Sequence, residues 1–304
     1  MNLKPMLNAY PDSLGGTLGD IVTLLKQDDM KGVFGSFYIL PSLYHSDLDR
    51  GFSVIDYDIN EELAERDDLE ALKEVGIDLK LDFILNHASA QSPQFKDLVE
   101  KGDASEYKNF FIDWNVFWEG YGSMTEEGYI QPDETYIKDM FFRKPGLPIL
   151  MVQFPDGTKR PYWNTFYQEE HYPQYLGQMD LDIRSAKVWD FYRETLAKIA
   201  SYGASIVRLD AFAYAPKAPG RKNFLNEPET WDLLEPVSYT HLDVYKRQDC
   251  ILDPGWSCTE YGINFLSDLQ KRYVRRAVRI SERKCSIVFH CDCGNLCFSA
   301  AFYQ

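Results

Sequence analysis

The sequence of 304 residues lacks a long apolar run, and it has no cysteine before residue 250. A membrane-spanning helix needs about 18 or more consecutive apolar residues, so we expect none. The first residues carry one lysine and no long apolar segment, so we expect no secretory signal and a cytoplasmic location. The absence of cysteine from residues 1–236 excludes disulfides and thiolate metal sites there.

Positive charge is also scarce in the chain. There are 32 basic and 47 acidic residues, which give a formal net charge of −15. Because an acidic surface repels a phosphate backbone, we expect no nucleic-acid partner. Hydrophobic residues make up 45% of the chain, which excludes disorder along its whole length. The length fits one large domain or two ordinary ones.

Charge and cysteine content both change near residue 237. Residues 1–236 carry 23 basic and 40 acidic residues, whereas residues 237–304 carry 9 and 7. All six cysteines lie in the second part. This difference in composition indicates that the two parts of the chain have different origins. The cysteines do not form two separated CxxC pairs, so we assign no metal site.

The segment at this boundary, residues 237–248, reads VSYTHLDVYKRQ. One synonymous back-translation is an inverted repeat over nearly its whole length. It resembles two copies of the transposase mosaic end used to prepare DNA libraries, joined head to head. A natural linker is the alternative, and a match along the whole segment makes it remote. We therefore interpret residues 237–248 as a sequencing artefact and leave residues 249–304 unassigned.

Helix-like and strand-like segments alternate along residues 1–236. Apolar spacing predicts helices over 17–27, 61–76 and 185–203. It predicts strands over 4–10, 32–41, 77–87 and 204–214. Residues 88–178 interrupt this alternation and are rich in aromatic residues, proline and glycine. The alternation predicts an α/β fold with a parallel sheet covered by helices.

Polar residues gather at the ends of two predicted strands. Asp82, Asn86 and His87 follow one strand, and Arg208 and Asp210 end another. Barrel enzymes place their chemistry at the carboxyl ends of parallel strands. Arg208 points to the same side as Asp210, so we expect it to lower the pKa of Asp210 and keep a nucleophile ionised. A structural ion pair is the alternative that the spacing alone favours.

These residues resemble conserved regions of the α-amylase superfamily of retaining glycosidases, in its sucrose phosphorylase branch. DFILNH (82–87) matches the first region and SIVRLDAFAY (205–214) the second, while QMDLD (178–182) resembles a motif between them. Further matching segments are 39–57, 86–97, 104–114 and 227–235. The likeness runs from about residue 3 to residue 236.

The resemblance implies the N-terminal half of a (β/α)8 TIM barrel with an insertion after the third strand. Residues 1–87 would hold barrel strands 1–3, residues 88–178 the insertion, and residues 179–236 the region of strand 4. Four of eight strands cannot close a barrel. The isolated chain would then expose two sheet edges, which promote aggregation, and would be inactive.

The activity implied by the resemblance is phosphorolysis of sucrose to α-glucose 1-phosphate and fructose, by a retaining double displacement. Its partners would be a small α-glucoside and inorganic phosphate, with no cofactor and no metal. Three alternatives stay open. One is a phosphorylase of sucrose 6-phosphate, glucosylglycerol or glucosylglycerate, and the second is an α-glucoside hydrolase. The third is an inactive truncated chimera. The oligomeric state is also open.

The resemblance assigns roles to individual residues as well. Asp210 would be the nucleophile, and Arg208 would orient it. The residues expected to contact the sugar or flank the nucleophile are Asp49, Phe52, His87 and Tyr214. Those expected to be structural at the site are Asp82 and Asn86. In the family, the acid/base glutamate follows the part that residues 3–236 resemble, so we expect it to be absent from this chain. Glu227, Glu229 and Glu235 come too early in the sequence to take its place.

Two other groups allow alternative interpretations. His45 is either part of a substrate subsite or a solvated loop histidine. The aromatic residues Trp114, Phe117, Trp118 and Tyr121 form either a platform for a sugar ring or a small core.

Overall fold

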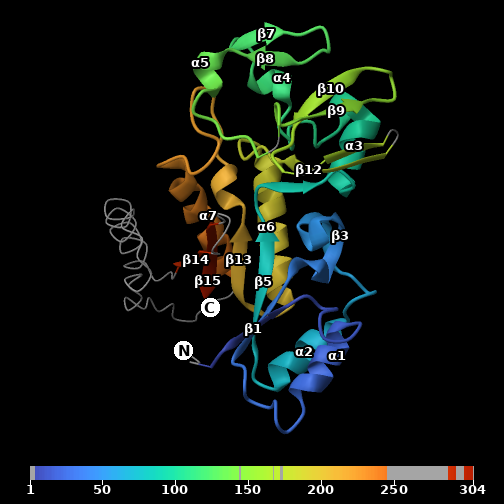
Figure 1. The fold of residues 1–304 in the computed structure, drawn as a ribbon, viewed down its shortest axis with the longest axis vertical. Coiled ribbons are helices and arrows are strands. Elements are labelled where there is room, and N and C mark those ends of the chain that lie inside the picture. The colour runs from blue at the N-terminus through green and yellow to red at the C-terminus, as the bar shows by residue number, and fades with distance from the viewer. Residues whose placement is uncertain are drawn as a thin grey trace.

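The computed structural model describes residues 4–143, 145–166, 168–171, 174–244, 287–291 and 298–303. Its centre is a sheet in which four parallel strands lie side by side (Figure 1). These are β1 (Met6–Ala9), β2 (Ser36–Ile39), β5 (Asp78–Ile84) and β13 (Ala204–Asp210). The strands follow one another in sequence order, as in a barrel, whereas a doubly wound sheet reverses its order. The predicted partial (β/α)8 barrel is therefore confirmed.

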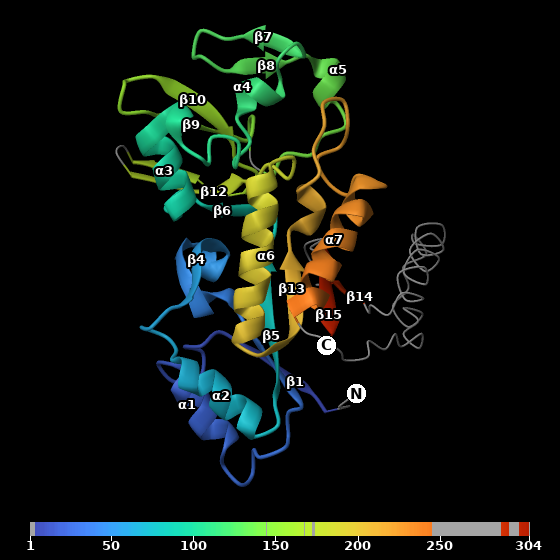
Figure 2. The ribbon, with the colours of Figure 1, turned by 180° about the vertical axis from the view of Figure 1, so that it is seen from behind.

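Helices cover the outer side of these strands (Figure 2). They are α1 (Leu18–Leu25), α2 (Arg66–Glu74), α6 (Ala186–Ser201) and α7 (Glu229–Val244). The longest of the predicted helices, α6, shows why they form. It buries Val188, Tyr192 and Ile199 on one face, a spacing that places them along a single helical stripe against the sheet. The three predicted helices are confirmed, each with shorter bounds.

Two features of the barrel region differ from the prediction. A hairpin of β3 (Tyr44–Leu48) and β4 (Ser53–Ile59) follows β2, and the apolar pattern did not indicate it. The sheet also continues past β13 through β15 (Phe298–Tyr303) to β14 (Ile287–Cys291), both pairings antiparallel. The edge of β13 is thus paired, so the expectation that it would be exposed is wrong.

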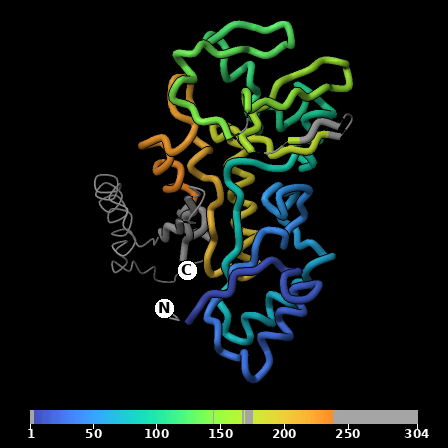
Figure 3. Tube along the Cα trace, viewed as in Figure 1, coloured from blue at the N-terminus to red at the C-terminus, as the bar shows by residue number. Residues whose placement is uncertain are grey.

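The insertion leaves and re-enters the barrel at one place (Figure 3). The strand β6 (His87–Ser89) pairs antiparallel with β12 (Gln174–Asp180), and His87 stands opposite Asp180. Between them lie short helices and hairpins. These elements are α3 (Pro93–Lys101), α4 (Trp114–Phe117), β7 (Gly122–Met124), β8 (Ile130–Pro132), α5 (Glu134–Ile137), β9 (Ile149–Gln153), β10 (Lys159–Trp163) and β11 (Gln168–His171).

The insertion has an apolar core of its own. Trp114, Trp118 and Trp163 are fully buried in it, together with Phe117. The rings of Trp118 and Trp163 are stacked, with centroids 6.2 Å apart. These aromatic side chains are therefore a small core, and the alternative of a sugar platform is wrong for them. Tyr121 lies outside this core and packs edge-on against Tyr136.

Residues 245–286 and 292–297 lie outside the described residues. They include the end of segment 237–248 and most of the unassigned tail. Among the helices that the structure describes, none combines the length and the apolar character that a membrane crossing needs.

Candidate active site

One arginine holds two carboxylates at the ends of the central strands. In the register of β13 against β5, Arg208 stands beside Asp82. Its Nη1 donates to Oδ1 of Asp82 at 2.8 Å, and its Nη2 lies 2.7 Å from Oδ1 of Asp210. The hydroxyl of Tyr38 on β2 donates to the other oxygen of Asp82 at 2.7 Å. Three adjacent strands thus fix the direction in which Asp210 points.

The pKa of Asp210 is raised, which corrects the prediction that Arg208 would lower it overall. Burial is the largest cause, and the charge of Asp49 adds to it. Arg208 and Arg143 act in the predicted direction, because a nearby cation favours the ionised carboxylate, but burial outweighs them. Burial likewise raises the pKa of Asp82. The sequence pattern revealed the cation and could not reveal how much water the fold removes.

The backbone after Asp210 turns sharply. Ala211 adopts a left-handed conformation with φ of 53°, which is uncommon for a residue with a side chain. A single turn of 3₁₀ helix, Phe212–Tyr214, follows. The strand therefore ends at Asp210, four residues before the predicted end. The turn leaves Asp210 at the tip of β13, and the backbone nitrogen of Tyr214 donates to the carbonyl oxygen of Ala211 at 3.0 Å.

Phe52 and His87, both predicted to contact the sugar, lie within hydrogen-bonding distance of each other. His87 lies at the start of β6, and its Nε2 is 3.0 Å from the carbonyl oxygen of Phe52 in the loop between β3 and β4. The Arg208 guanidinium lies 5.7 Å from the centre of the Phe52 ring. Burial lowers the pKa of His87. A neutral imidazole is therefore favoured at this position.

Asp49 belongs to the same loop as Phe52 and faces the insertion. Its Oδ2 accepts a hydrogen bond from Nε2 of Gln178 on β12, at 3.2 Å. The structure thus brings together the residues that the sequence singled out. They come from three places in the chain: the β3–β4 loop, the end of β5 with β6, and the end of β13.

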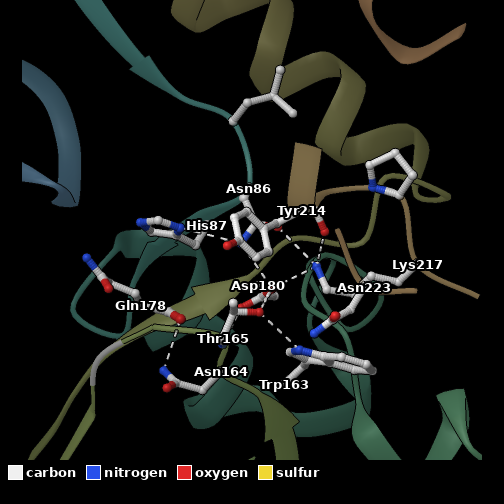
Figure 4. Close-up of polar contacts among 12 residues, drawn as sticks. Asn86, His87, Trp163, Asn164, Thr165, Gln178, Asp180, Tyr214, Lys217 and Asn223 are labelled. Atoms are coloured by element: carbon white, nitrogen blue, oxygen red, sulfur yellow. Dashed lines mark hydrogen bonds and ion pairs between the residues drawn. The ribbon is translucent and has the colours of Figure 1, made fainter. Parts of the chain in front are cut away.

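A buried polar cluster joins the insertion to the strand ends (Figure 4). Oδ2 of Asp180 accepts hydrogen bonds from Nδ2 of Asn86 at 3.0 Å and from the hydroxyl of Thr165 at 2.6 Å. Nζ of Lys217 lies 2.8 Å from the same oxygen and donates to Oδ1 of Asn86 at 3.0 Å. Asn86 therefore links Asp180 to Lys217, and its structural role at the site stays a prediction.

Lys217 brings a positive charge into this interior. Its side chain is 1% exposed, and it also donates to the carbonyl oxygen of Tyr214. The ammonium lies 5.5 Å from the centre of the Trp163 ring, within range of a cation–π contact. Lys217 therefore ties the turn after Asp210 to the insertion. Among the described residues, no group of three or more His, Cys, Asp or Glu side chains could hold a metal ion.

Arg143 of the insertion is a residue that the sequence analysis missed. Its Nη1 donates to the hydroxyl of Tyr214 at 3.2 Å, and its guanidinium lies 5.1 Å from the centre of the Phe166 ring. Phe166 in turn packs on His87 and on Tyr214, with ring centroids 5.0 and 5.1 Å away. The insertion thus places an aromatic ring against His87 and Tyr214, and a cation whose charge lowers the pKa of Asp210. These residues lie in segments without regular periodicity, so no pattern indicated them.

The remaining candidates have other partners. Oε1 of Glu227 accepts a hydrogen bond from the Trp231 indole, and Glu229 pairs with Arg221. His45 lies between two carboxylates, with Nδ1 2.8 Å from Asp56 and Nε2 3.0 Å from Glu61. His45 thus has two carboxylate partners, and both of its interpretations stay open.

Comparison with known proteins shows which proteins this chain resembles. No protein-family model matches the chain. The chain is 56% identical over 236 residues to a sucrose 6(F)-phosphate phosphorylase of Ilumatobacter coccineus, covering 76% of this chain and 45% of that protein. It is 36% identical to a sucrose phosphorylase of Streptococcus mutans, covering 77% of this chain and 45% of that protein. The chain thus spans less than half the length of these curated relatives.

Solved structures agree with this comparison. The crystal structure of a sucrose 6F-phosphate phosphorylase from Thermoanaerobacter thermosaccharolyticum matches with a TM-score of 0.70 and 32% identity, over 80% of this chain and 47% of that one. An isomaltulose synthase from Protaminobacter rubrum shares the fold, with a TM-score of 0.61 at 17% identity. The fold is that of the α-amylase superfamily. Within it, this chain is homologous to the sucrose and sucrose 6F-phosphate phosphorylases.

Proposed function

We propose that residues 1–236 are the first part of a phosphorylase that cleaves a sucrose-type α-glucoside and retains the α configuration. The observation that carries this proposal is the position of Asp210. Its carboxylate ends β13 and is held by Arg208, the charge of Asp49 acts on it, and the same Arg208 lies 5.7 Å from the centre of the Phe52 ring. The relatives at 56% and 36% identity are both phosphorylases.

In the first chemical step, a carboxylate oxygen of Asp210 attacks the anomeric carbon of the glucosyl group. The bond from that carbon to the fructosyl oxygen breaks, and an acid supplies a proton to the departing oxygen. That acid is the glutamate expected beyond residue 236. The glucosyl group is then covalently bound to Asp210. Arg208 keeps the carboxylate oriented, and its charge opposes the effect of burial on the pKa of Asp210.

In the second step, an oxygen of inorganic phosphate attacks the same carbon and releases the Asp210 carboxylate. Two inversions give α-glucose 1-phosphate. Phosphate requires a positive charge near the bond that forms. Arg143 meets this need, because it donates a hydrogen bond to the Tyr214 hydroxyl and its positive charge lowers the pKa of Asp210. Asp49 and His87 would bind the glucose hydroxyl groups, and Phe52 would pack on the apolar face of the sugar.

The glucosyl donor is either sucrose itself or its 6F-phosphate ester. Sucrose is the substrate that the sequence resemblance implies, and the Ilumatobacter relative at 56% identity favours the phosphate ester. Both substrates undergo the same reaction at the anomeric carbon. They differ in a phosphate group on the departing fructose. Positively charged side chains near that group would therefore favour the phosphate ester over sucrose.

The test begins with the complete gene. A sequencing read across codons 225–260, made without transposase treatment, shows whether the reading frame continues into the second half of a barrel. The purified product is then incubated with sucrose or sucrose 6F-phosphate, with and without inorganic phosphate. We expect α-glucose 1-phosphate only when phosphate is present. Release of free glucose at the same rate without phosphate would instead establish a hydrolase.

A further inference from the structure

The loop that carries Asp49 has a strained backbone. Asp49 and Arg50 both have positive φ, at 52° and 50°. Left-handed conformations are uncommon outside glycine, and two consecutive residues of this kind need support from their surroundings. The loop has no room to move toward the barrel. A Cβ on Gly51, which has φ of 110°, would lie 2.2 Å from the backbone nitrogen of Ser42.

The support comes from the outer side of the loop, through the side chain of Arg50. Its Nη2 donates to both carboxylate oxygens of Asp12, at 2.8 and 2.9 Å. Its guanidinium lies 4.1 Å from the centre of the Tyr10 ring. Both partners belong to the segment that follows β1, so Arg50 fastens the β3–β4 loop to the end of the first barrel strand. Burial raises the pKa of Tyr10, and the charge of Asp49 contributes to this shift.

We propose that Arg50 is a positioning residue. Its contacts with Asp12 and Tyr10 hold Asp49 and Arg50 in the left-handed conformation, and this conformation presents Asp49 and Phe52 to the glucosyl group. On the inner side, Gln178 holds the Asp49 carboxylate, and the imidazole of His87 reaches the Phe52 carbonyl oxygen. The loop is thus held from both sides. For its substrate, this proposal rests on the function proposed above.

The kinetic test compares variants of the complete enzyme. We expect Arg50→Ala to raise KM for the glucosyl donor by about 10-fold to 100-fold, with a smaller change in kcat, because a displaced loop misplaces a binding group. Asp12→Asn should act in the same direction, since it removes the partner without touching the loop. Arg50→Gly should fall between Arg50→Ala and the unchanged enzyme, because glycine adopts positive φ without strain.

The matched control is a similar contact in the insertion. Arg160 on β10 pairs with Asp103 at 2.7 Å, and its guanidinium lies 4.6 Å from the centre of the Phe154 ring. Arg160→Ala and Asp103→Asn should leave KM and kcat within about twofold. If Arg50→Ala and Asp12→Asn also leave KM within about twofold, the positioning role is overturned. A fall in thermal stability with unchanged KM would overturn it as well, because that result describes a merely structural contact.

A second readout does not depend on activity. Crystal structures of the complete enzyme and of its Arg50→Ala variant would show the backbone at residues 49 and 50. We expect these residues to leave the left-handed region in the variant. If they keep positive φ, the proposal fails whether or not the enzyme is active. If the unchanged enzyme has no phosphorolytic activity but the loop moves as expected, only the proposed function fails.

Discussion

At the residue scale, the main feature is the competition between burial and charge at Asp210. Burial disfavours the carboxylate, and the Arg208 guanidinium at 2.7 Å favours it. A retaining glycosidase needs the ionised form as its nucleophile. Arg208 is itself held by Asp82, which Tyr38 also contacts. The ionisation and the direction of Asp210 therefore depend on side chains from β2, β5 and β13.

Replacement of Asp210 tests this role. Asp210→Asn keeps the shape of the side chain and removes the nucleophile, so we expect turnover by the complete enzyme to fall on the order of 10⁴-fold. The control is Asp190→Asn on α6, an exposed carboxylate that pairs with Arg193. Turnover of the control should stay within about twofold of the unchanged enzyme. Phosphorolysis by the Asp210 variant at a tenth of the normal rate would contradict the assignment.

Lys217 allows a prediction about stability. Lys217→Met would leave the buried carboxylate of Asp180 without its cation, a change that typically costs about 3–5 kcal/mol. Lys198→Met is the matched control, because Lys198 pairs with Asp58 at 2.6 Å on the surface. Such exposed pairs contribute about 0–1 kcal/mol. Chemical denaturation of the complete enzyme measures both. Equal losses for the two variants would contradict the stabilising role of the buried pair.

His45 gives a prediction about pH. Hydrogen bonds to Glu61 and Asp56 raise its pKa in the folded state above the usual value of about 6.5. A raised pKa of this kind contributes stability that is fully present below about pH 6.5 and is lost as pH rises through the folded-state pKa. His45→Gln should therefore lower Tm more at pH 5.5 than at pH 8.5. The opposite order, or an equal loss at both values, would refute this sign.

The spacing of residues along a strand indicated site positions only at strand ends, and the loop residues Asp49 and Phe52 came from the resemblance alone. Arg208, Asp210 and Asp82 follow from the alternation of side chains along a strand and from the resemblance. Lys217 and Arg143 lie in loops whose contacts depend on tertiary structure, so the sequence did not indicate them. Asp180 lies in the QMDLD segment that was recognised, but its partners come from three separate parts of the chain.

At the element scale, the β3–β4 loop depends on one glycine. Gly51 has positive φ and lies against the backbone of Pro41 and Ser42. We expect Gly51→Ala to displace the loop and to raise KM for the donor. Gly76→Ala is the control, since Gly76 has φ of 78° but nothing lies within 4 Å of its Cβ position. It should cost only the left-handed strain, roughly 1–2 kcal/mol, and leave KM unchanged. An unchanged KM in the Gly51 variant would show that the loop tolerates the displacement.

Regular elements were predicted well, and irregular ones were not. The helix α6 has a continuous apolar stripe, and β5 and β13 are apolar runs with clear ends. The β3–β4 hairpin has charged residues on both strands and a strained loop between them. Its sequence therefore resembles that of a polar loop and does not show the pattern of two strands. The insertion is stabilised by a tryptophan cluster joined over long sequence separations, and periodicity carries no signal for such contacts.

At the scale of the whole molecule, the proposed function would give this chain one half of a catalytic pair. The retaining mechanism needs two carboxyl groups about 5–5.5 Å apart. Asp210 is the proposed nucleophile, and the acid/base glutamate is expected beyond residue 236. We therefore expect the purified 304-residue chain to release no fructose from sucrose, with or without phosphate. Phosphate-dependent release of fructose by this chain would contradict the expectation.

The partial barrel could be predicted because its four strands follow one another with helices between them. The pairing of β13 with β15 could not, because it joins the barrel to a tail of different composition. A strand exposed at a sheet edge attracts any available extended segment. This general tendency explains why the open side of β13 is covered, although it does not specify β15.

The central claim is that Asp210 forms a covalent bond with the glucosyl group. The most direct measurement is peptide mass spectrometry of the complete enzyme, quenched with acid during turnover of sucrose, or of its 6F-phosphate ester, without inorganic phosphate. We predict an added mass of one glucosyl residue on the peptide that contains Asp210, and its disappearance when phosphate is added before the quench. A glucosyl group on another carboxylate, or an unmodified enzyme that still produces α-glucose 1-phosphate by single displacement, would contradict the account.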